Sequence, residues 1–360
     1  MHPRNVGPLL KNRYFPQAFR ASRPYFSKSS VAALLSSFTR GGLKVGTDAL
    51  VGSIASAATA SGVPSDQLLR LNFLPNETAI AQTMLQLELD GTPLYDLAPA
   101  LVEALSHSDP GDMCLSDLRA PNRAYYMHWG PQPDMLLHGQ HPVEGAVVLS
   151  SDTDWRIVLT ARTSNSWLMA LQRDSFVLRF PAVTLDLPFD QAVDLAIEED
   201  RADYLRAFHA SRQEFAATVT ELDQFEQDLA VNTPVLKRAL QLAANSMAYL
   251  VAYPEDARYD WQPDAPSSML TKLARGEKEA KRTVSKLSNL GFLQVHRVGL
   301  DFQLASDASS AAGAGAGGAM EPHWRRGHWR HQAHGPEMKL RKLLWMRPTR
   351  VLGGPNRGTK

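Results

Sequence analysis

Short segments with hydrophobic residues at every second position occupy the middle of the chain. Between Trp155 and Thr160, for example, Trp, Ile and Leu alternate with Arg, Val and Thr. Alternation with a period of two predicts β-strands. The segments of this kind are Ala124–Trp129, Glu144–Ser150, Trp155–Ala161, Trp167–Gln172 and Phe176–Phe180. Turn-forming residues separate them over connections too short for a crossover helix, so we expect an antiparallel sheet.

Helical periodicity lies on both sides of these strands. The predicted helices are Pro75–Leu89, Ala98–Ser106, Ala192–Glu199, an acidic helix from Leu205 to Leu229, Val235–Val251, and one that begins at Ser267 or Ser268 and ends at Gly291. Val235–Val251 is apolar nearly all round, which predicts a buried central helix. The preceding Thr233-Pro234 pair is typical of a helix start. Phe292–Leu304 reads as a further strand.

The first sixty residues follow no clear period. Residues 1–30 are basic and aromatic, and two interpretations stay open: an arm that lies on the domain, or a disordered basic arm. From Ser30 to Ala60 small residues dominate and glycines interrupt, each weakening a helix by about 1 kcal/mol. The sequence therefore does not predict how residues 1–120 fold.

Together these patterns predict an α+β protein with a short-stranded antiparallel central sheet packed by helices. We expect a basic N-terminal arm and small-residue region over 1–120, and an α+β core domain over 121–305. The Ala/Gly/Ser run Ala308–Ala319 is typical of a flexible linker. We therefore predict a linker over residues 306–320. A basic aromatic tail follows at 321–360.

Charge is distributed unevenly along the chain, although the formal net charge is only +1. The first 47 residues hold eight Lys or Arg and no acid, whereas residues 190–230 hold eleven acids against three Arg. Basic ends and an acidic middle can pair within the molecule or leave a basic surface for nucleic acid. A single cysteine, Cys114, excludes a disulfide framework and a thiolate zinc site, and it fits a reducing cytoplasm.

The most distinctive stretch is Pro322–Gly354, which we call the cassette. It carries three of the seven Trp and four of the eleven His, and a His-Trp pair repeats around Gly327. From Pro322 to Lys360 there are ten Lys or Arg against one acid, Glu337. Guanidinium groups interleaved with indoles suit cation–π stacking and the binding of phosphate or carboxylate.

Three interpretations of the cassette stay open: an RNA contact, a contact with an acidic protein, or a strand docked on its own domain. In the first, Trp324 and Trp329 would stack on bases while Arg neutralises phosphate. The candidate binding residues are His323, Trp324, Arg325, Arg326, Gly327, His328, Trp329, Arg330 and Trp345. An extended peptide has a separate candidate site, at an open edge of the central sheet or in a groove beside Val235–Val251.

Enzyme motifs are missing from the chain. It has no GxSxG elbow, no phosphate-binding GxxxxGK[ST] loop and no HExxH. Four tail histidines, His323, His328, His331 and His334, have a spacing that could gather around a metal, but the neighbouring Arg would repel a divalent cation. We therefore predict no catalytic residues, no metal and no cofactor. A metal-dependent nuclease that uses these histidines is kept as a second alternative.

The cassette also resembles a known family. The run Pro322-His323-Trp324-Arg325-Arg326-Gly327-His328-Trp329, then Gly335-Pro336 and Trp345-x-x-Pro348-x-x-Val351, is similar to the C-terminal signature of a type V-A anti-CRISPR family of mobile elements. An apolar helix that runs into Tyr253-Pro254-Glu255-Asp256 adds to the resemblance.

This resemblance implies a non-enzymatic anti-defence protein in the cytoplasm of a bacterial host. It would lower the level of a type V-A CRISPR effector nuclease by recognising the effector's nascent N-terminal peptide and promoting loss of its mRNA. The basic tail would provide a contact with the ribosome or with RNA, and no membrane partner is implied. The first alternative is an RNA- or ribosome-binding module of a mobile element with another target.

Overall fold

A computed structural model describes residues 13–63, 73–119, 122–152, 154–161, 175–215, 219–304, 306–307 and 323–351. The predicted strand Trp167–Gln172 and the run Ala308–Ala319 lie outside these ranges. The α-helices are α2 (Phe15–Ser22), α3 (Lys28–Ala60), α5 (Phe73–Leu89), α6 (Pro99–Ser106), α8 (Phe189–Phe215), α9 (Val219–Ala252), α10 (Ser267–Leu273) and α11 (Glu277–Leu290). Short 3₁₀ turns are η2 (Pro24–Phe26), η3 (Leu115–Leu118), η4 (Ala182–Thr184), η5 (Pro254–Asp256) and η7 (Pro336–Met338). The predicted domain boundaries stay a prediction.

A seven-stranded sheet forms the centre of the molecule, in the order β6-β5-β4-β3-β1-β8-β7. Its strands are β1 (Leu94–Leu97), β3 (Ala124–Leu137), β4 (His141–Ser150), β5 (Asp154–Ala161), β6 (Ser175–Pro181), β7 (Arg258–Trp261) and β8 (Gln294–Val298). Neighbours from β3 to β6 are antiparallel, as are β7 and β8.

The expectation of a purely antiparallel sheet of short strands is wrong, because the sheet is mixed. β1 pairs in parallel with both β3 and β8, and β3 is 14 residues long. A parallel pair needs a crossover of a dozen or more residues. The chain between β1 and β3 supplies one that contains α6 and η3. Antiparallel pairing therefore holds from β3 to β6, as expected, but not at β1.

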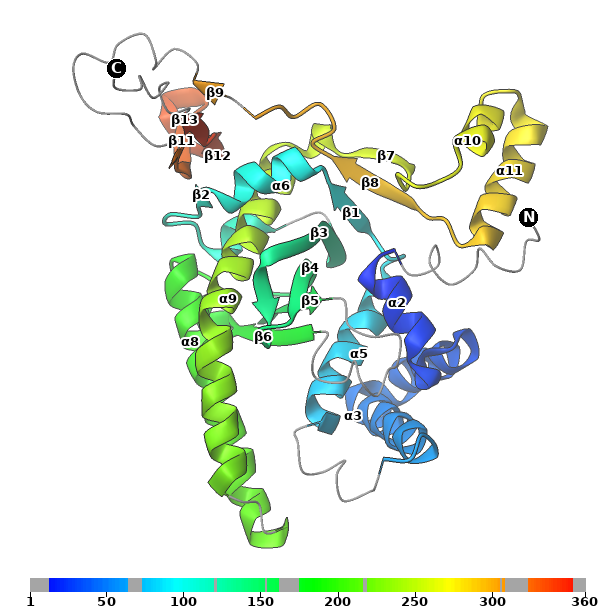
Figure 1. The fold of residues 1–360 in the computed structure, drawn as a ribbon, viewed down its shortest axis with the longest axis vertical. Helices are drawn as coiled ribbons and strands as arrows, with labels where there is room; N and C mark the ends of the chain where they lie inside the picture. Colours follow the sequence, from blue (N-terminus) through cyan, green and yellow to red (C-terminus); the bar gives the residue numbers. More distant parts are fainter. Residues whose placement is uncertain are drawn as a thin grey trace, which may run out of the picture.

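Helices cover both faces of this sheet. Alternate residues of β3 separate the two sides: Tyr125 and Met127 belong to the cluster with α6, α8 and α9, whereas Ala124 and Tyr126 belong to the cluster with α2, α3 and α5. Figure 1 shows the strands between these two helical layers. Burial on both faces explains why β3 and β4 are rich in fully buried residues.

The predicted central helix is confirmed, but α9 begins earlier, at Val219, and runs through Pro234. Thr233-Pro234 is therefore not a helix start. The proline removes one backbone bond, while contacts to other elements hold the preceding turns. Arg201 on α8 donates to Glu226 at 2.9–3.1 Å, and the Asn232 side chain accepts a bond from the backbone of His138 at 2.6 Å.

Two other helical segments also differ from expectation. The small-residue stretch folds as the long helix α3, broken at Gly42, whose φ of 74° is not helical. Leu50, Ile54 and Ala58 on one side of α3 are buried, so tertiary packing outweighs the weak helix propensity. The single helix expected from residue 267 to 291 is divided into α10 and α11 at Gly276, and Gly291 ends α11 in the left-handed conformation as predicted.

Residues 13–26 lie on the domain. Tyr14, Phe15, Phe19, Tyr25 and Phe26 are all buried in the cluster with α3 and α5. Within the described ranges, none of the helices combines the length and the apolar character needed to span a lipid bilayer.

Candidate binding surface in the C-terminal cassette

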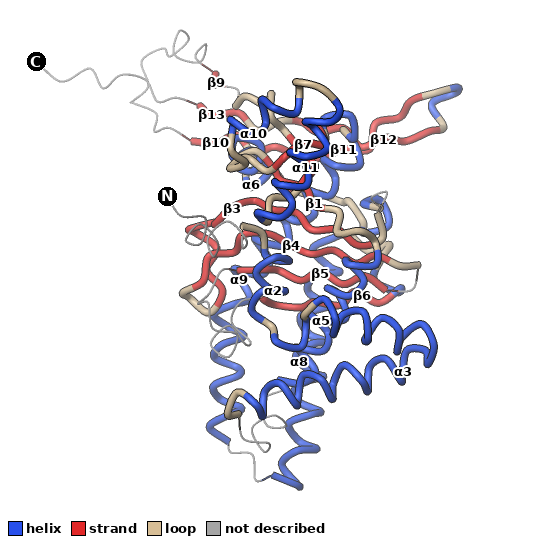
Figure 2. The backbone as a smooth tube through the Cα atoms, turned by 90° about the vertical axis from the view of Figure 1, so that its right-hand side faces the viewer, coloured by secondary structure: helices blue, strands red, loops and turns tan. Residues whose placement is uncertain are grey.

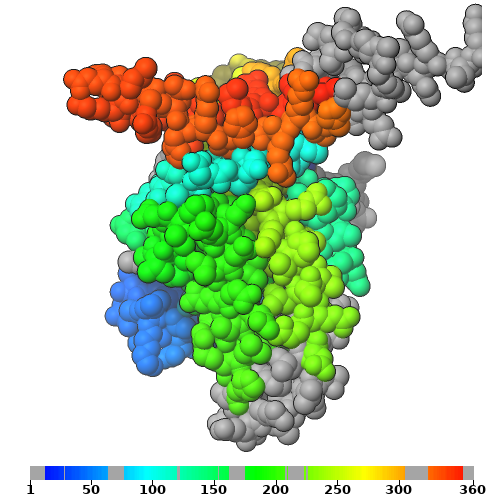
Figure 3. Space-filling view, turned by 90° about the vertical axis from the view of Figure 1, so that its left-hand side faces the viewer, coloured from blue at the N-terminus to red at the C-terminus, as the bar shows by residue number. Residues whose placement is uncertain are grey.

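The cassette folds as two small strand pairs against the body of the protein. β11 (Gly327–His334) and β12 (Leu340–Met346) form an antiparallel hairpin, and β11 also pairs in parallel with β2 (Ser108–Asp109). β10 (His323–Arg325) pairs with β13 (Thr349–Val351), which pairs in parallel with β9 (Ser306–Asp307). Figure 3 shows the hairpin in orange, lying across the body above α6, α8 and α9.

The inner face of the hairpin is built on two indoles. Trp329 and Trp345 are direct cross-strand partners, and their rings stack with centroids 5.8 Å apart. Both are almost fully buried, at 3% and 4% exposure. Stacking and burial of two such rings make this pair the main apolar anchor of the cassette.

Each indole N–H has a specific partner in the body. Trp329 Nε1 donates to Asn245 Oδ1 of α9, and Trp345 Nε1 donates to Ser108 Oγ of β2, both at 2.9 Å. Asn245 Nδ2 in turn donates to the carbonyl oxygens of Leu105 and Ser108 at 2.9 Å. Because all of these groups are buried, removal of one partner leaves an unsatisfied polar atom in the interior.

Gly327 allows the hairpin to approach the body closely. A Cβ at this position would lie 2.7 Å from both Ser108 Oγ and Pro348 Cδ, and 2.9 Å from the carbonyl oxygen of Met346. The Gly327 N–H donates to the carbonyl oxygen of His107 at 3.0 Å. The glycine is required here for space and not for an unusual φ.

An aromatic cluster extends from Trp345 into the body. Phe302 stacks on Trp345 at 5.6 Å, and Tyr249 of α9 meets the same indole edge-on at 5.7 Å. The Arg347 guanidinium lies 5.1 Å from the Phe302 ring centroid. Burial, and then the hydrogen bond to Asp256, raise the pKa of Tyr249 far above its ordinary value. The tyrosine therefore stays a neutral donor to Asp256.

The start of the cassette makes looser contacts. The half-buried Trp324 stacks on His107 with ring centroids 4.4 Å apart, and Arg326 forms an exposed ion pair with Asp109 at 3.3 Å. Partial burial lowers the pKa of His107. Exposed pairs of this kind contribute little to stability.

The outer face of the hairpin has a different character. Side chains that alternate with the inner indoles point away from the body. Those with an exposed surface include His328, Arg330, Leu340, Lys342 and Met346. The hairpin tip projects beyond the body (Figure 2). The result is a strand pair with a buried aromatic side and a solvent-facing basic side.

Comparison with known proteins identifies the family to which this sequence belongs. The sequence model of the AcrVA2-like family, described as the anti-CRISPR type V subtype A2 family, matches residues 95–353. The chain belongs to this anti-CRISPR family. The matched range of the AcrVA2-like family runs from β1 to the residues just after β13, and it includes the whole hairpin. No curated protein matches the chain in a sequence search.

Among solved structures, the chain is similar to one described as the crystal structure of AcrVA2. The two share 12% identity with a TM-score of 0.34, and the similarity covers 89% of this chain and 97% of that chain.

The cassette of this AcrVA2-like chain divides its predicted binding residues into two groups. Gly327, Trp329 and Trp345 are buried and hold the hairpin in place, so Trp329 does not offer a face to an RNA base in this conformation. The residues with exposed or half-exposed side chains are His323, Trp324, Arg325, Arg326, His328 and Arg330. Whether these bind a partner stays a prediction.

The residues that receive the cassette could not be found by sequence reasoning. Ser108, Asn245 and Phe302 lie far from one another along the chain, and each is ordinary in its local sequence. β2 has only two residues and carries no periodic signal. The one available hint was a pair of indoles in need of buried acceptors.

The tail histidines do not form a cluster. Across the described part of the chain, no group of three or more His, Cys, Asp or Glu side chains converges as a metal site would require. His331 instead lies 3.4 Å from Asp117. In a strand, a spacing of three residues puts His328 and His331 of β11 on opposite faces of the hairpin, so in the described chain these histidines do not converge on one metal position.

The two candidate peptide sites differ in accessibility. The cassette covers part of α9, because Trp329 donates a hydrogen bond to Asn245 and Trp345 packs against Tyr249. The second candidate site is an open edge of the sheet, and β7 is an edge strand of the seven-stranded sheet. Arg258, Tyr259 and Asp260 of β7 are exposed.

Proposed function

We propose that this anti-CRISPR protein lowers the level of a type V-A effector nuclease by binding the effector's nascent N-terminal peptide and promoting loss of the mRNA. It does so as a non-enzymatic inhibitor in the bacterial cytoplasm. Family membership supports the anti-CRISPR role. The observation that carries the peptide step is the exposed edge strand β7, to which an extended chain can add by backbone hydrogen bonds.

The hydrogen-bonding pattern of β7 favours such an addition. The Gln262 N–H just after β7 donates to the carbonyl oxygen of Leu293 at 3.0 Å. Residues of an antiparallel pair face their partner alternately, so the amide groups of Tyr259 and Trp261 face away from β8. The Trp261 N–H donates a hydrogen bond to the side-chain oxygen Oδ1 of its neighbour Asp260 at 2.7 Å. The Tyr259 amide is thus the main backbone group that an added strand would use.

Aromatic side chains lead from this edge into the sheet. Tyr259, 63% exposed, packs on His296 with ring centroids 5.0 Å apart, and His296 stacks on Tyr95 at 4.9 Å. Tyr95 is held by a hydrogen bond from Asn122 at 2.9 Å. A rigid aromatic row beside an open edge offers apolar contact to alternate side chains of an extended peptide.

The cellular test is co-expression of this protein with the effector, followed by measurement of effector mRNA and protein. We expect both to fall, and we expect the effect to disappear when the first few tens of codons of the effector are replaced by an unrelated sequence. Continued loss of the recoded effector would exclude recognition of the N-terminal peptide.

The edge itself is tested by two substitutions at one position. Tyr259→Pro removes the outward N–H, which an edge strand tolerates, whereas Tyr259→Val keeps it. We expect the proline variant to lose inhibition and the valine variant to retain most of it, with matching thermal unfolding curves. Equal inhibition by both variants would place peptide recognition elsewhere.

A second candidate function is a contact between the cassette and RNA or the ribosome. It is favoured by the exposed basic side chains Arg330 and Lys342 on the outer face of the hairpin. Such a contact would serve the first function by holding the protein near the emerging chain, or would serve a different target of the mobile element.

A further inference from the structure

A basic pocket lies between α10 and α11, outside the cassette. These helices project from the end of β7 and β8 (Figure 1) and form what we call the α10–α11 lobe, residues 267–290. The lobe has a small core in which Leu287 packs with Trp261 and Phe292. Its sequence holds six Lys or Arg against two Glu.

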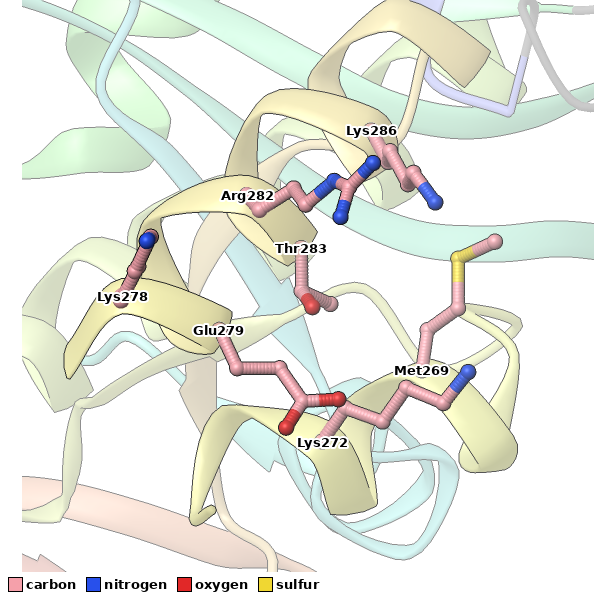
Figure 4. Close-up of a pocket in the computed structure, with 7 residues that line it drawn as sticks. All are labelled: Met269, Lys272, Lys278, Glu279, Arg282, Thr283 and Lys286. Atoms are coloured by element: carbon pink, nitrogen blue, oxygen red, sulfur yellow. The ribbon is translucent and has the colours of Figure 1, made fainter. Parts of the chain in front are cut away.

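Four of these cations line one cavity of about 480 Å³. Lys272 comes from α10, and Lys278, Arg282 and Lys286 come from α11. Figure 4 shows the side chains around the space between the two helices. The cavity has one carboxylate, Glu279, and one apolar lining residue, Met269. The lining therefore carries a large excess of positive charge.

Apart from Glu279, the described protein places no carboxylate against this charge. Among the described residues, none of the four cations forms an ion pair or a side-chain hydrogen bond. The ion pair within the lobe joins Lys281 to Glu277, and neither residue lines the cavity. Thr283, only 5% exposed, also lines the cavity. A hydroxyl group among unpaired cations suits an anionic ligand.

The arrangement along α11 favours a polymer of phosphates. Lys278, Arg282 and Lys286 are each four residues apart, so they form one stripe with a rise of about 6 Å between successive side chains. This rise is similar to the distance between neighbouring phosphates of a nucleic-acid strand. The cavity lacks the apolar anchors that a helical or extended peptide would need. It also lacks aromatic rings for base stacking.

We infer that the α10–α11 lobe binds the phosphate backbone of single-stranded RNA, without sequence preference, through Lys272, Lys278, Arg282 and Lys286. Phosphate contacts of this type position a protein on RNA but do not read its sequence. The inference does not depend on peptide recognition at β7, and it places an RNA contact outside the cassette.

The test uses the full-length purified protein and a fluorescently labelled oligouridine, with binding followed by anisotropy across a salt series. The test variant is Arg282→Ala with Lys286→Ala. The matched control is Arg275→Ala with Lys281→Ala, which removes the same charge from the same lobe outside the cavity. We expect about tenfold weaker binding for the test variant, and a salt slope smaller by about 1.4, since each single-strand phosphate contact contributes about 0.7.

The control variant is expected to change affinity by less than half as much on a logarithmic scale. Equal losses in both variants would reduce the effect to diffuse charge and overturn the assignment, as would an oligouridine that does not bind at low salt. Arg330→Ala with Lys342→Ala, in the cassette, tests the second candidate function in the same assay. We expect a smaller loss of affinity there than in the lobe, and an equal or larger loss would also overturn the assignment.

Glu279→Gln provides a test that loss of folding cannot imitate. Removing the cavity's carboxylate should strengthen oligouridine binding severalfold, because the acid repels phosphate. Unchanged or weaker binding would contradict the inference. A polyglutamate competitor separates RNA from an acidic protein: displacement of the oligouridine at equal charge concentration would assign the pocket to acidic peptides instead.

Discussion

The cassette and the α10–α11 lobe are both basic, but they use their charge differently. In the cassette, cations alternate with indoles that bond to Asn245 and Ser108, so one side of the hairpin is anchor and only the other faces solvent. In the lobe, cations from two helices converge on one cavity. A conspicuous sequence motif can therefore consist mainly of residues that dock a segment on its own domain. The less conspicuous Lys and Arg residues of the lobe converge on one cavity, as the residues of a binding site do.

The largest effect is expected from Trp329→Ala. This substitution removes a buried indole and leaves Asn245 Oδ1 without its donor, so we expect a loss of about 3–5 kcal/mol in the free energy of unfolding. Chemical denaturation measures it. The neighbouring Arg330→Ala serves as the control and should cost less than about 0.5 kcal/mol. Similar losses for both would mean that the inner face is not the anchor.

A smaller loss is expected from Gly327→Ala. The added methyl would lie within 3 Å of atoms on both sides of the strand, and such overpacking costs about 1–3 kcal/mol. We expect faster hydrogen exchange and easier proteolysis in β11 and β12. Gly52→Ala in α3 is the control, because its Cβ meets nothing within 4 Å; it should be neutral or slightly stabilising.

Substitutions on the outer face separate docking from partner binding. Arg330→Ala with Lys342→Ala should change stability by less than about 0.5 kcal/mol. If the cassette contacts RNA or the ribosome, the double variant should nevertheless reduce loss of effector mRNA in the co-expression assay. Full activity of the folded double variant would leave the cassette with a docking role alone.

The smallest effect is a pH dependence at the start of the cassette. Burial lowers the pKa of His107 below its ordinary value of 6.5, so folding favours the neutral imidazole. The stability from this site is present above pH 6.5 and is lost as pH falls through 6.5 toward the folded-state pKa. Thermal unfolding at pH 7.5 and pH 5 measures it. His107→Gln should show a smaller decrease between the two; an equal decrease would assign the dependence to other groups.

Local patterns were sufficient for many elements of the fold. Period-two alternation found β3, β4, β5 and β6, and helical periodicity found α5, α6 and the buried half of α9. These predictions succeed because burial on a regular element fixes the spacing of its apolar residues. Propensity failed at Pro234 and in α3, where tertiary contacts outweigh a local preference.

The sequence by itself determined the α+β class, the antiparallel half of the sheet, the family resemblance and the exceptional character of the cassette. Only the tertiary structure decided that β1 lies between β3 and β8, that the cassette indoles are buried, and that four separate cations share one cavity. The physical reason is that alternation and periodicity are local. The partners of a strand edge or an indole, in contrast, can come from segments hundreds of residues away, such as Ser108 and Trp345, and the four cations of the cavity meet only because two helices pack together.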